Sequence, residues 1–183
     1  MQLNLSSFPL AKQRILEVFL GVALLAICSQ ITIPFKPIPV TLQTIAVLFI
    51  GLTYDKITAP LTMLCYITIG VMGAPVMMNY SGGLAKLTGP TAGYLAGFLI
   101  AVYVMASLKN KAFTANKFIN QFILCLIGNA IVTGLGWLWL SKFLGLKEAF
   151  YSGVLFFIIP GMIKSLLLVG LINVVKPKSK YTS

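Results

Sequence analysis

The sequence predicts an all-α polytopic membrane protein with six transmembrane helices and both termini in the cytoplasm. The 183-residue chain is 58% hydrophobic and only 9% charged, with a mean hydropathy of +0.96, whereas soluble domains carry about 25% charged residues. Six apolar segments approach or exceed the roughly 20 residues that span a bilayer. They cover residues 15–33, 39–53, 57–73, 91–108, 118–140 and 149–175, with an outer loop at 74–90, so that residues 1–183 form a single membrane domain.

The basic residues in the loops predict the orientation of the chain. With both termini inside, nine basic residues lie on the cytoplasmic side and four on the outer side, as the positive-inside rule requires. The inner set is Lys12, Arg14, Lys56, Lys109, Lys111, Lys117, Lys176, Lys178 and Lys180, and the outer set is Lys36, Lys86, Lys142 and Lys147. The net charge of +11 is then a property of membrane loops, and we expect contact with lipid and none with nucleic acid. The expected location is the bacterial inner membrane.

The first predicted helix is followed by a stiff, polar connection. Pro34, Pro37 and Pro39 fall within six residues, and prolines at this density prevent a continuous helix. The second segment then opens with polar residues, among them Gln43. Gln43 and Gln30, which ends the first segment, are both expected near the outer interface. Such residues either bind a ligand or form hydrogen bonds between helices.

The outer loop at residues 74–90 is long for so small a protein and therefore is a candidate lid or binding loop. Asn79 offers a donor and an acceptor, and Tyr80 offers a flat ring with a polar tip. Gly82 and Gly83 lack side chains that would keep backbone N–H groups away from a ligand. A passive flexible connection is the other interpretation of this loop.

The fourth segment begins with Gly93 and Gly97 in a G-x-x-x-G pattern, which is typical of close packing between membrane helices. Tyr94 lies beside this face and is free to contact another neighbour. In the fifth segment, Asn129 and Thr133 are one helical turn apart within an apolar run. They either line the interior of the bundle or bond to neighbouring helices.

Lys164 is the one charged residue in the last apolar run, residues 151–175. A cation at the centre of a membrane helix costs about 2.5–3.5 kcal/mol on insertion scales, so a polar partner or ligand must offset that cost. Pro160 and Gly161 interrupt the same helix one turn earlier, and proline removes a backbone hydrogen bond there. A kink and a charge together indicate a cavity.

Several functions lack the residues that they need. The chain has no histidine, and its three acidic residues, Glu17, Asp55 and Glu148, lie near helix ends or in loops. Catalysis by a histidine dyad or a metal therefore has no candidate residues, and we expect neither an enzyme nor a bound cofactor or metal. There is also no phosphate-binding loop, so energy for uptake against a gradient has to come from another subunit.

Taken in order, these motifs resemble the BioY family, the biotin-specific substrate-binding (S) components of energy-coupling-factor (ECF) transporters. The resemblance runs from IPFKPIPVTLQT through GAPV, NYSGG and GPTAGYLAGF to PG-x-x-K. It implies a six-helix membrane protein that captures biotin at the outer face. It also implies a coupling module of two ATPases and a transmembrane subunit, although some members of the family act alone.

The resemblance also assigns expected roles to individual residues. Small residues of the first helix contact the coupling subunit in the family, and their nearest equivalents here are Gly21, Ala23 and Ala26. The family motif Pro-Gly-Asp-x-x-Lys is matched at Lys164, with Met162 interpreted as the replacement of the acid that would bind the ureido group. Asn79 and Gln43 are neutral substitutes for that acid.

The resulting hypothesis places biotin under the 80–83 loop. Asn79 and Gln43 meet the ureido group, Lys164 binds an oxygen, Tyr94 forms a wall, and backbone amides at Gly82 or Gly83 bind the carboxylate. Two alternatives remain open from the residues alone. The chain could be an S-component for another vitamin such as thiamine or riboflavin, or a small structural or channel-like membrane protein without a ligand.

Overall fold

The computed structural model describes residues 10–35, 38–111 and 113–175. Nearly all of its regular structure is helical. The elements in chain order are α1 (Leu10–Gln30), β1 (Thr32–Ile33), β2 (Val40–Thr41), α2 (Gln43–Thr53), α3 (Thr58–Val71), the 3-10 turn η2 (Met78–Tyr80), α4 (Ala85–Thr88), α5 (Ala92–Leu108), α6 (Lys117–Leu144), α7 (Leu146–Phe150), the π-helical turn η3 (Tyr151–Leu155) and α8 (Phe156–Val175).

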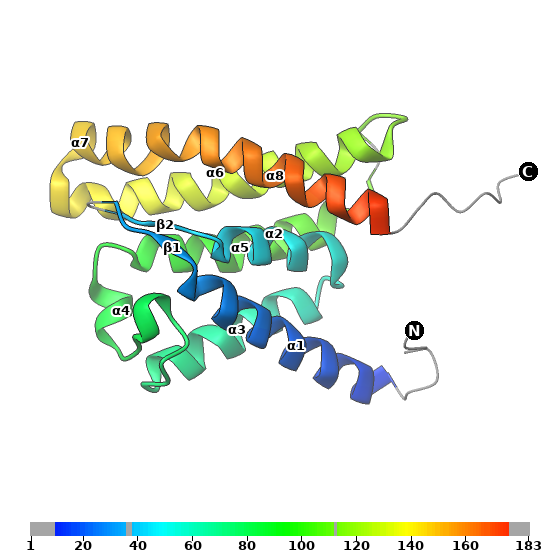
Figure 1. The fold of residues 1–183 in the computed structure, drawn as a ribbon, viewed down its shortest axis with the longest axis horizontal. Helices are drawn as coiled ribbons and strands as arrows, with labels where there is room; N and C mark the ends of the chain where they lie inside the picture. Colours follow the sequence, from blue (N-terminus) through cyan, green and yellow to red (C-terminus); the bar gives the residue numbers. More distant parts are fainter. Residues whose placement is uncertain (1–9, 36–37, 112, 176–183) are drawn as a thin grey trace, which may run out of the picture.

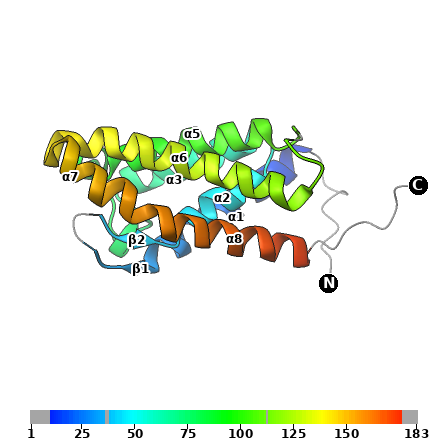
Figure 2. The same cartoon turned by 90° about the horizontal axis from the view of Figure 1, so that it is seen from above.

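The helices pack in three layers, with α6, α7 and α8 above, α2 and α5 in the middle, and α1, α3 and α4 below (Figure 1). Successive long helices run in opposite directions. As a result, α1 begins and α8 ends at the same end of the molecule, whereas the β1–β2 hairpin and α7 lie at the opposite end, as Figure 2 also shows. We call these the terminal end and the hairpin end.

The surface of the bundle is apolar over much of its area, as expected for contact with lipid. Within the described residues, two helical stretches, Lys117–Leu144 and Leu146–Val175, are long and apolar enough to cross a membrane, and α2, α3 and α5 are shorter apolar helices. Large hydrophobic side chains such as Phe19, Ile159 and Leu171 are more than 60% exposed. Water does not favour so much exposed apolar area, and this is a membrane protein.

The hairpin replaces helix that the sequence predicted at the ends of the first two segments. The first helix was expected to reach residue 33 and the second to begin at 39, but α1 ends at Gln30 and α2 begins at Gln43. Between them Thr32 pairs with Thr41, and Ile33 pairs with Val40. The proline-rich connection cannot supply a full helical hydrogen-bond ladder, so the backbone pairs across a hairpin instead. With 11 residues, α2 is about 16 Å long.

A polar turn joins α2 to α3 at the terminal end. The Asp55 carboxylate accepts hydrogen bonds from the backbone N–H groups of Ile57 and Thr58 at 2.7 and 2.9 Å and from the Thr58 hydroxyl at 2.7 Å. Partial burial opposes ionisation of Asp55, but these bonds and the Arg14 guanidinium together lower the pKa of its carboxyl below the ordinary value. Asp55 thus caps the start of α3.

The prediction of close packing at Gly93 and Gly97 is confirmed, and the partner is α6. A Cβ atom at Gly93 would lie 2.7 Å from the Leu135 carbonyl oxygen, and one at Gly97 would lie 2.9 Å from the Cα of Val132. Both distances are below van der Waals contact. The glycines therefore allow the α5 backbone to lie directly on α6, which fixes one wall of the interior.

We expect Gly93→Ala to destabilise the bundle by about 1–3 kcal/mol, because the added methyl group overpacks the α5–α6 contact. Gly134→Ala is the matched control, since a Cβ at Gly134 on α6 meets nothing within 4 Å. Thermal unfolding in detergent should show a lower midpoint for the first variant only. Equal midpoints for the two variants would contradict the packing assigned to Gly93.

Candidate functional site

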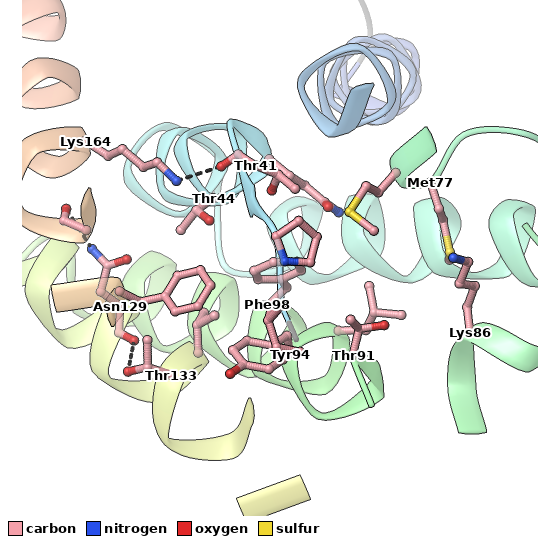
Figure 3. A pocket seen from close by; sticks show the side chains of 18 of the residues that line it. Thr41, Thr44, Met77, Lys86, Thr91, Tyr94, Phe98, Asn129, Thr133 and Lys164 are labelled. Atoms are coloured by element: carbon pink, nitrogen blue, oxygen red, sulfur yellow. Dashed lines mark hydrogen bonds between the residues drawn. The ribbon is translucent and has the colours of Figure 1, made fainter. Parts of the chain in front are cut away.

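A cavity opens between the hairpin, α2, α3, α5, α6 and α8. Its volume is about 90 Å³. Most of the wall area is apolar, although about half of the lining residues carry a polar side-chain group (Figure 3). The lining residues are Ile38, Pro39, Thr41, Gln43, Thr44, Tyr66, Met77, Met78, Lys86, Thr91, Tyr94, Leu95, Phe98, Asn129, Val132, Thr133, Phe157, Gly161 and Lys164.

Lys164 lies in the wall of this cavity, with only 8% of its surface exposed. Its ammonium nitrogen donates a hydrogen bond of 2.6 Å to the backbone oxygen of Thr41 (Figure 3). That oxygen is available because Thr41 belongs to β2 and precedes the start of α2. No Asp or Glu is among the described residues that line the cavity. The protein thus supports this cation with a carbonyl dipole and leaves its charge unneutralised.

Asn129 joins α6 to α8 beside Lys164. Its amide nitrogen donates to the Ser165 hydroxyl at 2.9 Å and lies 3.4 Å from the Gly161 oxygen. The Ser165 hydroxyl in turn donates to the Gly161 oxygen at 2.7 Å. Thr133 donates to the Asn129 backbone oxygen at 2.8 Å, and both residues of this polar pair line the cavity.

Gln43 is buried and lines the cavity from α2. Its amide nitrogen donates to the Tyr66 hydroxyl at 3.2 Å, and that hydroxyl donates to the Val76 backbone oxygen at 3.1 Å. This chain of hydrogen bonds links α2, α3 and the beginning of the 74–90 loop. It fixes the direction in which the Gln43 amide points.

Tyr94 forms the wall between α5 and the last helical stretch. Its hydroxyl donates to the Gly153 oxygen at 3.1 Å, and its ring lies beside the Phe157 ring with centroids 6.1 Å apart. A Cβ atom at Gly136 would overlap the Tyr94 ring. The absence of a side chain on α6 thus makes room for the tyrosine.

The 74–90 loop does not present its predicted residues to the cavity. Asn79, Tyr80, Gly82 and Gly83 are not among the lining residues, and Tyr80 is 75% exposed. The Gly83 N–H donates to the Gly70 oxygen at 2.7 Å, so it is already used within the protein. Gly82 lies against the end of α3, where a Cβ would come 2.8 Å from the same Gly70 oxygen.

Other residues of the same loop do reach the cavity. Met77 lines it just before the η2 turn, Met78 lines it from the start of that turn, and Lys86 lines it from α4. Figure 3 shows Lys86 and Lys164 on opposite sides, with Met77, Phe98 and Tyr94 between them. Sequence reasoning counted Lys86 only as a loop charge, because nothing local in the sequence distinguishes it from Lys142 or Lys147.

Gln30, at the end of α1, holds this loop in place. Its amide nitrogen donates to the Met77 oxygen at 3.1 Å, and its amide oxygen accepts the Tyr80 N–H at 2.9 Å. Asn79 and Tyr80 between these contacts have positive φ angles of 58° and 51°. Such angles are unfavourable for most residues with side chains. The turn is closed by backbone hydrogen bonds between Met77 and Ser81, and the Gln30 side chain adds bonds from α1.

Met162 lies on the opposite side of α8 from the cavity and is 48% exposed. The residue that lines the cavity one turn before Lys164 is Gly161. In the spacing Asp-x-x-Lys, the acid stands three residues before the lysine, which is position 161 in this chain. Residues three apart share a helix face, so such an acid would face the cavity beside Lys164. Met162 follows Pro160 and Gly161 as the acid does in the family motif, but it lies two residues before Lys164 and does not share the helix face of that lysine.

The three small residues of α1 differ in their surroundings. Gly21 is buried, and a Cβ there would lie 3.1 Å from the Tyr54 ring. Ala23 and Ala26 are half-buried, and the large side chains of Phe19 and Ile27 near them are exposed. Gly21 therefore serves packing within the bundle.

A mostly apolar cavity with oriented polar groups, inside a bundle with an apolar surface, defines a membrane-embedded protein that binds a small molecule. The fold matches the solved S-component for biotin from an ECF-type ABC transporter with a TM-score of 0.80 at 22% identity, covering 94% of this chain and 96% of that chain.

Sequence comparison then narrows the class. The chain is 40% identical over 162 residues to the probable biotin transporter BioY of Rickettsia prowazekii (strain Madrid E), which covers 88% of this chain and 82% of the relative. It is 35% identical over 148 residues to the probable biotin transporter BioY of Pyrococcus horikoshii, covering 81% and 86%. The model of the BioY family matches residues 2–181, and the chain belongs to the BioY family.

Gln30→Leu should release the turn at Asn79 and Tyr80 while leaving the bundle folded. Each lost hydrogen bond is worth about 0.5–1.5 kcal/mol, so amide hydrogen exchange at Tyr80 and Ser81 should become several-fold faster. Gln13→Leu is the control, because Gln13 lies on the same helix and its side chain donates to the Glu17 side chain. Unchanged exchange in the Gln30 variant would contradict its role in holding the loop.

Proposed function

We propose that this chain is the substrate-binding component of a biotin uptake system. It captures biotin at the outer face, and separate ATPase and coupling subunits supply energy for release into the cell, unless the chain acts alone. Membership of the BioY family supports the substrate class. The structural observation that carries the proposal is an apolar cavity with a lysine on each of two opposite sides, Lys164 and Lys86.

This arrangement suits the chemistry of biotin. The molecule has a compact bicyclic head with a polar ureido group at one end, an apolar middle, and a carboxylate at the end of an aliphatic chain. Lys164 has three N–H donors, one of which is given to Thr41, so the others are available to the ureido oxygen. Tyr94, Phe98 and Phe157 enclose the apolar part.

The carboxylate is assigned to Lys86. Its ammonium group is the cation that lines the cavity on the side away from Lys164, whereas the Gly83 N–H is already bonded to Gly70. The loop that carries Asn79, Tyr80, Gly82 and Gly83 acts as the outer lid. In this proposal Asn79 reaches the ligand only when that loop moves inward, and Gln43 contacts the head from α2.

The proposed topology has six membrane segments with both ends in the cytoplasm of a bacterial cell. The first segment is α1, and the second is the hairpin together with α2. The other four are α3, α5, α6 and the continuous stretch from α7 to α8. Apart from Lys164, six of the described basic residues lie toward the terminal end and three toward the hairpin end, which supports this orientation. Lys36, Lys176, Lys178 and Lys180 lie outside the described residues. The coupling subunit then contacts α1 through Ala23 and Ala26, since Gly21 is buried.

Calorimetric titration of the purified chain tests the proposal directly. Biotin should bind saturably with a stoichiometry of one, and thiamine and riboflavin, the ligands of the alternative function, should not compete. Saturable binding of thiamine or riboflavin without biotin would assign the chain to another vitamin, and the absence of all binding would refute the function.

Lys164→Ala should weaken biotin binding by about 2–5 kcal/mol, because a buried donor to the ligand is lost. Lys142→Ala is the control, since Lys142 lies over the Trp139 ring, 4.3 Å from its centroid, and does not line the cavity. Both variants should elute and unfold like the parent chain. An unchanged affinity in a folded Lys164 variant would remove this residue from the site.

Lys86→Met should weaken binding of biotin by about 1.5–3 kcal/mol, the range for a hydrogen bond to a charged group. The methyl ester of biotin lacks the carboxylate charge, so its affinity should change far less. Comparing the two ligands in the parent and the variant isolates the contact with the carboxylate. An equal loss for acid and ester would show that Lys86 does not recognise the carboxylate.

A further inference from the structure

We propose that Asn129 presents a fixed hydrogen-bond acceptor to a ureido N–H of the ligand, and that Ser165 is the positioning residue that fixes it. This inference rests on the proposed function, because it takes the ligand to be a cyclic urea. The Asn129 amide is an uncharged group in the part of the cavity where the family motif would place an acid.

The orientation of the Asn129 amide follows from the protons available around it. A serine hydroxyl has one proton to donate, and that of Ser165 goes to the Gly161 oxygen, 2.7 Å away. Toward Asn129, 2.9 Å away, the hydroxyl can therefore act only as an acceptor. The amide must turn its NH₂ group to Ser165, and this places its Oδ1 atom on the other side.

The other side is the cavity. Asn129 lines it together with Gly161 and Lys164, and Figure 3 shows the side-chain oxygen of Asn129 directed toward the interior. Within the described part of the chain, Asn129 Oδ1 receives no hydrogen bond. Every fully buried side-chain oxygen or nitrogen there has a partner, so Oδ1 is not fully buried but open to the cavity. Oδ1 is thus an open acceptor that faces the space where a ligand would lie.

Gly161 leaves room for this arrangement. A Cβ at position 161 would stand 3.4 Å from Asn129 Oδ1, so any longer side chain would occupy the place in front of the amide. Since Gly161 and Lys164 share a face of α8, an acid there would also lie beside the ammonium group. In this chain the glycine clears that position, and the acceptor comes from the facing helix instead.

Together, Lys164 and Asn129 offer a donor and an acceptor in the same part of the cavity. A cyclic urea has a carbonyl oxygen flanked by N–H groups, which is the complementary pattern. An amide is a weaker acceptor than a carboxylate, but it avoids burying a second charge and leaves the cavity positive. A net positive cavity favours a ligand that carries a carboxylate at its other end.

The test compares biotin with two isosteric analogues, the cyclic carbamates in which one or the other ring N–H is replaced by oxygen. Asn129→Leu should lower biotin affinity about ten-fold or more. For one of the two carbamates the same variant should have no effect, because that ligand lacks the N–H that Asn129 accepts. Asn129→Asp should retain biotin binding, since a carboxylate is also an acceptor.

The positioning role of Ser165 is tested in the same assay. Ser165→Ala should reduce the preference for biotin over that carbamate, because the amide is then free to turn, and Ser165→Thr, which keeps the hydroxyl, should restore it. Asn173→Leu is the matched control: Asn173 joins α8 to α6 through Gln121 at 2.7 Å and does not line the cavity.

The outcomes separate this inference from the function on which it rests. If the parent chain binds biotin and Asn129→Leu has no effect, or weakens biotin and both carbamates equally, the acceptor role is refuted while the function stands. If the parent chain binds no biotin, the proposed function itself fails, and the acceptor role fails with it.

Discussion

The hydrogen bond from Lys164 to the Thr41 backbone oxygen is the interaction around which the site is built. An ammonium group inside an apolar bundle needs partners, and a carbonyl oxygen that is not already bonded within a helix is a suitable one. The chain meets this need by keeping the beginning of its second membrane segment out of the helix. Pro34 and Pro39 prevent a helical ladder there, and β1 and β2 pair in its place. A break of this kind is tolerated at membrane depth only where it lines a cavity.

The volume of the cavity depends on glycines that lie outside it. Gly93 and Gly97 set α5 directly against α6, and Gly136 accommodates the ring of Tyr94. Lipid provides little hydrophobic drive for association of helices, so close backbone approach and interhelical hydrogen bonds have to supply it. Rigid contacts beside the cavity allow its own wall to remain incompletely filled without collapse of the bundle.

The sequence predicted the membrane class, a cavity beside Lys164 and the close packing at Gly93 and Gly97, since each of these depends on a local pattern. It did not predict the hairpin, because a two-residue strand has no periodicity and needs its partner to form. Lys86 and Tyr66 were missed because their place in the cavity depends on which segments meet in space. Asn79 and Tyr80 were expected at the site from their chemistry alone. Their backbone conformation turns them toward the surface, which no pattern of side chains reveals.

The attachment of the loop to α1 through Gln30 has a thermodynamic consequence for transport. A partner that binds α1 and shifts Gln30 would do work on the turn at Asn79 and Tyr80, because the two share the same hydrogen bonds. Coupling of this kind is reciprocal. If the partner favours an open loop and the ligand favours a closed one, then a bound ligand weakens binding of the partner by the same factor. Release of cargo and engagement of the partner would then be linked in part through the hydrogen bonds that Gln30 makes to the loop.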